Sequence, residues 1–349
     1  MDLTIDSKLF NEFHSTVVAA VNLPITSRKI IEEFIDIDVT AEAVAKIIQR
    51  NQYFEYVLVK EIQSLGLKEN TPTLRAAISL LGMQRVRSFV CALQIMRSVA
   101  GKYPEIDASG KLNFKPSEYL PFALKTEEYV SVHRTEYPDT CYAAAMLFDV
   151  LLALGRAKLE NPKPFEEHIS EVYKHGMRTA KIATEIAKTT KKLGFSKYIF
   201  SAGLLHDIGK VALDFLFPAG KPNAYANFRA EIAKKPTNRE VTHFLEAKRF
   251  GLPHEYYSSQ IAYFSGVFKD LEKPLLFHHD PYLAGSANKE LAQFSHLLAL
   301  ATNIANNFRV PKDANDPIYD SWFTAEVKGF KVDKNTLHMT LLKMGRDSF

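Results

Sequence analysis

The sequence contains little of what marks a secreted, disulfide-bonded or membrane protein. Only two of its 349 residues are cysteine, which is too few for a disulfide framework. Cys91 and Cys141 each lie in an apolar run, so we expect buried thiols. No window is long and apolar enough to span a bilayer, and the first ten residues lack the basic and apolar regions of a signal peptide. We therefore expect no membrane association and a reducing, cytoplasmic location.

The net charge of the chain is also small. The chain has 44 Lys and Arg against 40 Asp and Glu, a net charge of +4. The densest basic stretch, residues 188–192, is interpreted as the solvated end of a helix, and we expect no DNA binding. An apolar fraction of 46% and a charged fraction of 24% are typical of a soluble globular protein. The length suits two domains or one large one.

Strand-like alternation is scarce too, whereas apolar residues recur at helical spacing in nearly every long segment. The sequence therefore predicts an all-α fold. Thr40 is expected to cap a helix, and residues 101–120, rich in Gly and Pro, are expected to form a loop. The predicted helices cover residues 41–50, 71–82, 83–100, 142–154, 167–191, 197–216, 239–250, 254–269, 291–308 and 335–344.

Pro162 and Pro164 mark a boundary before the longest predicted helix. We predict three parts: a helical part at residues 1–165, a second helical part at 166–310 and a tail at 311–349. The tail ends in a short amphipathic segment, which is expected to dock on the body or on a partner.

One internal echo links two apolar segments. Residues 142–154 align with residues 200–212, so that Asp149 matches Asp207 while Phe148 stands where His206 would be. Because that position has no imidazole, we expect no metal function there. Two similar buried helices explain the echo equally well.

The most informative motif is GLLHDIGKVAL at residues 203–213. It places His206, Asp207 and Lys210 in an apolar helical run, where buried polar groups are costly unless they are paired. Imidazole and carboxylate are metal ligands, and an ammonium group nearby can hold an anion. The motif therefore predicts a metal site that handles a phosphate. Four further histidines stand at positions that fit such a site: His175, His254, His278 and His279.

In chain order, these residues resemble the HD superfamily of metal-dependent phosphohydrolases. Its pattern is a His, then His-Asp, then a distal Asp, with a further His and a His-His pair in the two-metal branch. The resemblance implies that Asp207 bridges two ions and that Lys210, which completes HDxGK, contacts a substrate phosphate. It also implies these metal ligands: His175, His206, Asp207, His254, His278 and His279.

The N-terminal half is similar to HDOD domains, the regulatory branch of that superfamily. Residues 73–93, TLRAAISLLGMQRVRSFVCAL, carry the resemblance, which covers residues 16–310. It implies a helical HDOD subdomain ahead of an HD-like helical bundle, and regulation through protein partners. The family's Asp-Pro and Asn-Ser positions are replaced, near residues 51–52 and 63–64.

Thr302 stands where the family has its distal Asp. A neutral hydroxyl is a poor substitute for a carboxylate on a hard cation. The resemblance then leaves the first metal three ligands and the second metal four, so we expect the second site to be stronger. One or two divalent ions of Fe, Mn, Ni or Zn are expected.

Three functions are compatible with the sequence. The first is an HDOD-type signalling or regulatory protein with a partly degenerate metal site. The second is a phosphohydrolase, in which two metals activate a hydroxide that attacks a phosphate-containing small molecule or nucleotide. The third is a purely structural helical interaction protein. Thr302 favours the first, and the retained histidines count against the third. No Gly-Tyr-Pro follows His278-His279, so we do not expect the cyclic di-GMP hydrolysis of the HD-GYP type.

Overall fold

The structure is a computed structural model. It describes residues 7–22, 40–64, 73–101, 123–133, 140–190, 196–215, 224–234, 239–285, 288–313, 315–323 and 332–346. Across these ranges the regular structure is helical and no strand occurs, so the predicted all-α fold is confirmed. From residue 102 on, the predicted loop lies outside the described residues.

The chain divides into two compact units. The N-terminal unit is Ala20–Ala157, and the C-terminal unit combines Met1–Ala19 with Lys158–Phe349. The three-part division predicted from the sequence, at residues 1–165, 166–310 and 311–349, stays a prediction. Every residue expected at the metal site falls in the C-terminal unit.

The N-terminal unit is a set of short to medium helices. Thr40 caps the first as predicted, because its hydroxyl accepts a hydrogen bond from the Ala43 N–H. Gly82 separates two helices with φ of 79°, a conformation that glycine adopts without steric cost. The helices are α4 (Ala41–Gln49), α5 (Gln52–Ser64), α6 (Leu74–Leu81), α7 (Met83–Ala100), α8 (Leu124–His133) and α9 (Thr140–Lys158); α2 (Ala19–Val21) lies at the boundary with the other unit.

Asp149, on α9, caps a different helix. Its buried carboxylate accepts hydrogen bonds from the backbone N–H groups of Lys125 and Thr126, each at 2.8 Å, and from the Thr126 hydroxyl. These N–H groups belong to the first turn of α8, where no intrahelical acceptor is available. Asp149, the residue that aligns with Asp207, therefore serves as a helix cap.

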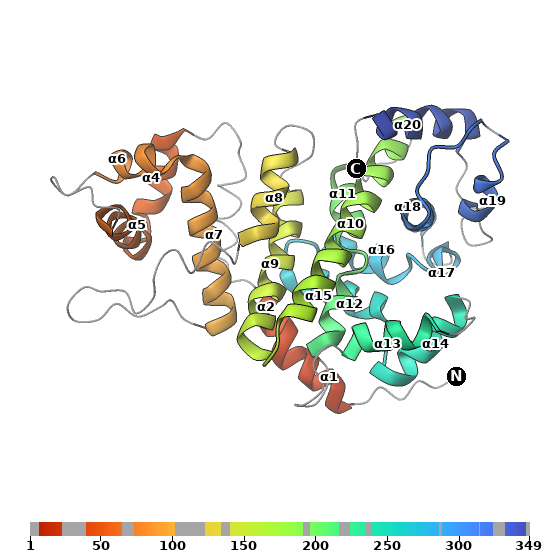
Figure 1. The fold of residues 1–349 in the computed structure, drawn as a ribbon, viewed down its shortest axis with the longest axis horizontal. Helices are drawn as coiled ribbons and strands as arrows, with labels where there is room; N and C mark the ends of the chain where they lie inside the picture. The colour runs from red at the N-terminus through yellow and green to blue at the C-terminus, as the bar shows by residue number, and fades with distance from the viewer. Residues whose placement is uncertain are drawn as a thin grey trace. The chain divides into compact units, whose positions relative to one another are not determined.

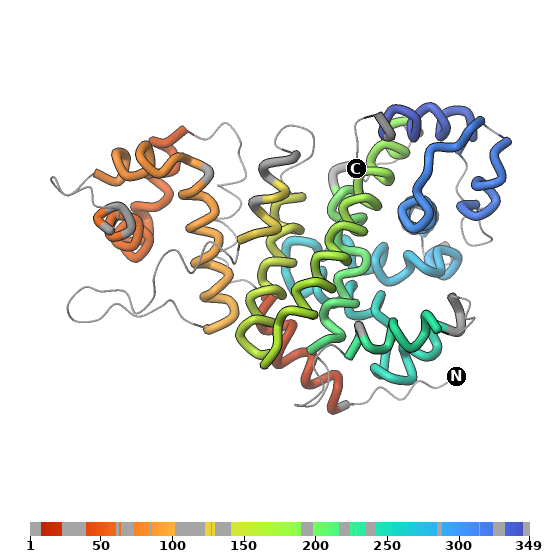
Figure 2. The backbone as a smooth tube through the Cα atoms, viewed as in Figure 1, coloured from red at the N-terminus to blue at the C-terminus, as the bar shows by residue number. Residues whose placement is uncertain are grey.

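The C-terminal unit is built around a long helix, α10. Helices α11 and α18 pack along it, and α12 packs against α15 (Figures 1 and 2). The elements are α1 (Ser7–Phe13), the π-helical turn η1 (His14–Val18), α10 (Lys163–Thr190), α11 (Ser196–Leu205), α12 (Ile208–Ala212), η4 (Leu213–Phe215), α13 (Ala224–Ile232), α14 (Arg239–Phe250), α15 (His254–Ser265), η5 (Lys269–Leu271), α16 (Glu272–Leu276), α17 (Pro281–Gly285), α18 (Lys289–Asn306), α19 (Ile318–Trp322) and α20 (Lys334–Arg346).

Close backbone contact fixes α11 against α10. A Cβ atom on Gly203 would lie 2.4 Å from the Ala180 Cα, and one on Gly176 would lie 2.4 Å from the Leu204 carbonyl oxygen. Both distances are far inside van der Waals contact, so only glycine fits at either position. This contact brings His175, on α10, close to His206, directly after α11, with ring centroids 5.1 Å apart.

The predicted continuous helix at 197–216 is wrong. It ends at Leu205, and His206 and Asp207 form a turn before α12 begins at Ile208. Asp207 has φ of −103° and ψ of 3°, in a sparsely populated region where active-site residues are often found. The break follows from tertiary packing, which overrides the local helical pattern.

Gly209 shows how that packing works. A Cβ atom at this position would lie 2.0 Å from the carbonyl oxygen of His254, and the Gly209 N–H donates to the Ser258 hydroxyl at 2.8 Å. The chain must therefore turn after Leu205 for α12 to lie directly on α15.

The C-terminal tail docks on the body, the first of its two predicted alternatives. Helix α20 packs against α10, and Trp322 of α19 is fully buried. Asp316 pairs with both terminal nitrogens of Arg309 and accepts the N–H groups of Lys312 and Ile318. This network fixes the connection after α18.

A single helix long and apolar enough to cross a membrane is absent from the part of the chain that the structure describes. One sharply bent pair, Leu74–Leu81 with Arg85–Ala100, passes on length and composition alone, a test that the buried core helices of soluble proteins also pass.

The Asp149 cap should make stability depend on pH. Burial raises the pKa of Asp149 from 3.8 to about 7, although the hydrogen bonds from Thr126 and Lys125 oppose the shift. The folded chain therefore keeps a proton that the unfolded chain releases above about pH 4. Stability from this group is present below that pH and is lost as the pH rises through 7. We expect the unfolding free energy of wild type, relative to Asp149→Asn, to fall by up to about 4 kcal/mol between pH 4 and pH 8. Urea titrations at both pH values measure this, and a difference that is independent of pH would contradict it.

Candidate metal centre

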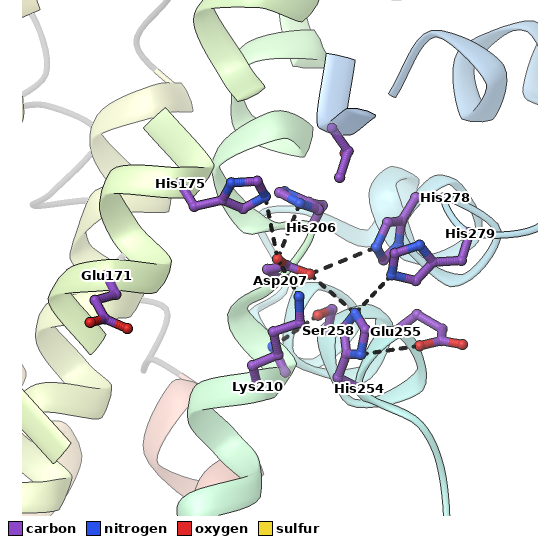
Figure 3. Close-up of polar contacts among 12 residues, drawn as sticks. Glu171, His175, His206, Asp207, Lys210, His254, Glu255, Ser258, His278 and His279 are labelled. Atoms are coloured by element: carbon purple, nitrogen blue, oxygen red, sulfur yellow. Dashed lines mark hydrogen bonds and ion pairs between the residues drawn. The ribbon is translucent and has the colours of Figure 1, made fainter. Parts of the chain in front are cut away.

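Asp207 lies at the centre of a cluster of imidazoles (Figure 3). Its Oδ2 atom lies 3.5 Å from the Nε2 of His175 and 3.4 Å from that of His206. Its Oδ1 atom lies 3.1 Å from the Nε2 of His254 and 3.9 Å from that of His278. The two oxygens of one buried carboxylate thus face two different pairs of histidines.

The ligand-type atoms form two groups that share Asp207. Within each group the atoms lie within 4.8 Å of one another. Atoms bound to one ion at about 2.1 Å are separated by roughly 3.0–3.4 Å, close to the distances around Asp207 and to the 3.0 Å between the Nε2 atoms of His254 and His279. The groups are His175, His206 and Asp207; and Asp207, His254, His278 and His279.

The hydrogen bonds of two histidines fix their tautomers. The Nδ1–H of His206 donates to the Gly203 carbonyl at 2.8 Å, and that of His278 donates to the Leu275 carbonyl at 2.6 Å. Since a carbonyl can only accept, each Nδ1 carries a proton, and in the neutral imidazole each Nε2 presents a lone pair toward Asp207.

These lone pairs face an acceptor. The Nε2 atoms of His206 and His278 and the Oδ1 of Asp207 are buried and have no hydrogen-bond partner among the described residues. Buried acceptors that face one another are costly unless a cation lies between them. The residues therefore fit a divalent metal ion.

For three of these residues, Asp207, His175 and His278, the electrostatics favour the protonation state that ligation needs. Burial opposes ionisation of Asp207, but His206 and Lys210 hold the pKa of its carboxyl well below the ordinary value. Burial lowers the pKa of His175 to about 3, and burial with the neighbouring imidazoles holds the pKa of His278 well below its ordinary range. Asp207 is thus ionised and both imidazoles are neutral near pH 7.

Glu246, which the sequence analysis missed, orients His254. This buried carboxylate on α14 accepts the Nδ1–H of His254 at 2.8 Å and the His254 backbone N–H at 3.0 Å. Burial opposes both charges, but the pairing lowers the pKa of Glu246 to about 2 and raises the pKa of His254 to about 9. The bond turns the Nε2 of His254 toward Asp207. The sequence gives no local signal for this pairing.

Two other expected residues lie as follows. The Nζ of Lys210 is 2.6 Å from the Oδ2 of Asp207, with 22% of its side chain exposed. Thr302, on α18, is buried and its hydroxyl donates to the Leu298 carbonyl at 2.9 Å. Its position supplies no carboxylate. Glu171, one turn before His175, points away from the cluster (Figure 3) and lies 3.8 Å from Arg229.

The six predicted ligands all belong to the two groups around Asp207. Their role as metal ligands stays a prediction. Sequence reasoning missed three residues around them, Glu246, His243 and Glu255. The last two join His254 and His279 in a third group of ligand-type atoms.

Comparison with known proteins finds one matching family model. Residues 145–281 match the model of the HDOD domain family. This segment is an HDOD domain. It contains all members of the two Asp207 groups.

Solved structures of low sequence identity cover most of the chain. They include a "Putative phosphohydrolase" from Shewanella amazonensis SB2B (18% identity, 97% of this chain and 94% of that chain, TM-score 0.46). An HDOD domain protein with unknown function from Geobacter sulfurreducens follows (15%, 96% and 95%, TM-score 0.38). The MmoQ response regulator from Methylococcus capsulatus str. Bath is also similar (18%, 91% and 95%, TM-score 0.35). No curated protein matches the sequence significantly.

The Glu246 bond should control metal affinity. In Glu246→Gln the carboxylate that holds the far nitrogen of His254 becomes a neutral amide, so His254 is less well oriented and less basic. We expect the Co²⁺ dissociation constant to rise about 10–100-fold, measured by competition with a chromophoric chelator. Glu231→Gln is the control, because Glu231 is exposed and pairs with Arg249. Equal affinities in the two variants would show that the bond has no part in binding.

Proposed function

We propose that this chain is an HDOD-type regulatory protein whose HD-like centre binds one divalent ion firmly and a second weakly. The supporting observation is the division of the Asp207 carboxylate. Its Oδ1 lies toward the histidines of a four-residue group and its Oδ2 toward those of a three-residue group, and Asp207 itself is counted in both groups. Regulation through protein partners is inferred from the HDOD family.

The weak first position is the reason to favour regulation over catalysis. Two-metal hydrolysis needs both ions, which supply Lewis acidity and lower the pKa of water. The hydroxyl of Thr302 donates to its own helix, so a neutral group stands where the superfamily has a charged ligand. A chain that holds the first ion poorly spends most of its time without a complete dinuclear centre.

Phosphohydrolase activity is the second candidate, and Lys210 is the observation that favours it. Its ammonium group pairs with Asp207 and is partly exposed. It could therefore turn from the carboxylate to a phosphate-containing molecule or nucleotide once the charge of Asp207 is neutralised. In this reading Lys210 holds the phosphate and Asp207 is shared between the two metal positions.

Metal content tests the proposal. Untagged protein should carry between one and two transition-metal ions per chain, among Fe, Mn, Ni and Zn, by elemental analysis. His254→Ala and His279→Ala should strip metal more completely than His175→Ala, because they remove ligands from the four-residue group. His338→Ala, which alters α20, is the control. Metal-free wild type after growth in metal-supplemented medium would refute the proposal.

Thr302→Asp tests why the first position is weak. A carboxylate there should add a ligand and a negative charge beside the cations. We expect metal content to approach two ions, hydrolysis of bis-p-nitrophenyl phosphate to increase, and the melting temperature to hold or rise because bound metal stabilises the folded chain. Thr302→Asn is the control, since it has a similar shape without the charge. If position 302 is an ordinary core site, Thr302→Asp melts lower, by a loss of about 1–3 kcal/mol, with unchanged metal content.

A further inference from the structure

A third group of ligand-type atoms adjoins the candidate centre. His243, His254, Glu255 and His279 offer atoms that all lie within 4.8 Å of one another. His254 and His279 also belong to the group around Asp207. His243, on α14, and Glu255, on α15, belong to this third group alone.

The geometry of these residues suits a cation. The Nδ1 of His243 lies 3.8 Å from the Oε1 of Glu255, and the rings of His243 and His279 have centroids 4.4 Å apart. The Oε2 of Glu255 is buried and lies 3.4 Å from the Nδ1 of His254. Figure 3 shows Glu255 and Asp207 on opposite sides of the His254 ring.

We call the group of Asp207, His254, His278 and His279 the inner group, and the group of His243, His254, Glu255 and His279 the outer group. The two groups cannot each hold an ion at the same time. The Nδ1 of His254 donates to Glu246 at 2.8 Å, so its Nε2 alone can bind metal. That atom lies 3.1 Å from the Oδ1 of Asp207 and 3.0 Å from the Nε2 of His279. Because one lone pair binds one ion, the groups are alternative positions for a single ion.

The two positions differ in their access to solvent. The side chains that belong to the inner position alone are almost fully buried, with 4% of Asp207 and none of His278 exposed. Those of the outer position are more open, with 24% of His243 and 12% of Glu255 exposed. The outer pair is therefore more accessible to an incoming ion than the inner pair.

We propose that His243 and Glu255 form an entry position, which captures a divalent ion and passes it to Asp207 and His278. His254 and His279 are common to both positions, so the ion exchanges two ligands and keeps contact with the others. The inference rests on the proposed metal binding and adds a route to it.

An entry position affects the rates of metal uptake and release, but it does not affect the free energies of the metal-free and metal-bound protein. Loss of the entry position should slow uptake and release by the same factor, so that the dissociation constant is unchanged. A residue that belongs to the final site, or that supports it structurally, would change the dissociation constant instead.

The test uses Co²⁺ with full-length protein stripped by a chelator. Uptake is followed by stopped-flow visible absorption, and release is followed after addition of excess chelator. We expect His243→Ala/Glu255→Gln to slow both by at least about tenfold, with the same final metal content and affinity. His243→Gln and Glu255→Gln singly provide milder changes should the double variant fold poorly, with circular dichroism as the check. His338→Ala is the matched histidine control.

The outcomes separate the two proposals. Unchanged rates in the double and both single variants, or a lower final metal content, would overturn the entry position while wild type still binds Co²⁺. Wild type that binds no Co²⁺ would instead refute the proposed metal centre, and the entry position with it.

Discussion

A buried carboxylate among imidazoles is the constraint on which the C-terminal unit depends. An ionised group taken from water is tolerated when it is paired and hydrogen-bonded, and Asp207 finds partners that arrive from several helices. The histidines come from α10, from the turn after α11, from the start of α15 and from the segment after α16. The glycine contacts at Gly203 and Gly209 serve this arrangement, because each allows two backbones to approach without side chains between them.

The centre is also defined by which nitrogen of each imidazole is free to bind. Backbone carbonyls take the Nδ1–H of His206 and His278, and Glu246 takes that of His254. The Nε2 atoms are thereby turned toward Asp207. A carboxylate partner makes its histidine more basic than a carbonyl partner does, so His254 differs electronically from the other two. This supports the four-residue group as the firmer position.

Three buried aspartates in this chain show how one residue type serves different ends. Asp149 caps α8. Asp214 accepts the Tyr225 N–H at 3.0 Å and bonds to the Nδ1 of His168 at 2.7 Å, which ties η4 to α10 and α13. Asp207 instead lies within 3.9 Å of the Nε2 atoms of four histidines. This setting among imidazoles, rather than burial alone, distinguishes the candidate ligand from the other two aspartates.

The sequence by itself determined the all-α class, the Thr40 cap, the start of α15 at His254 and the six ligand-type residues, because helical periodicity, capping and the HDxGK motif are local in the chain. Tertiary structure alone decided the break at His206–Asp207, since it follows from the contact of Gly209 with α15. It also decided the Glu246 partner, the helix that Asp149 caps, and the placing of His243 and Glu255 beside His254. These features depend on distances between helices, which local periodicity does not encode.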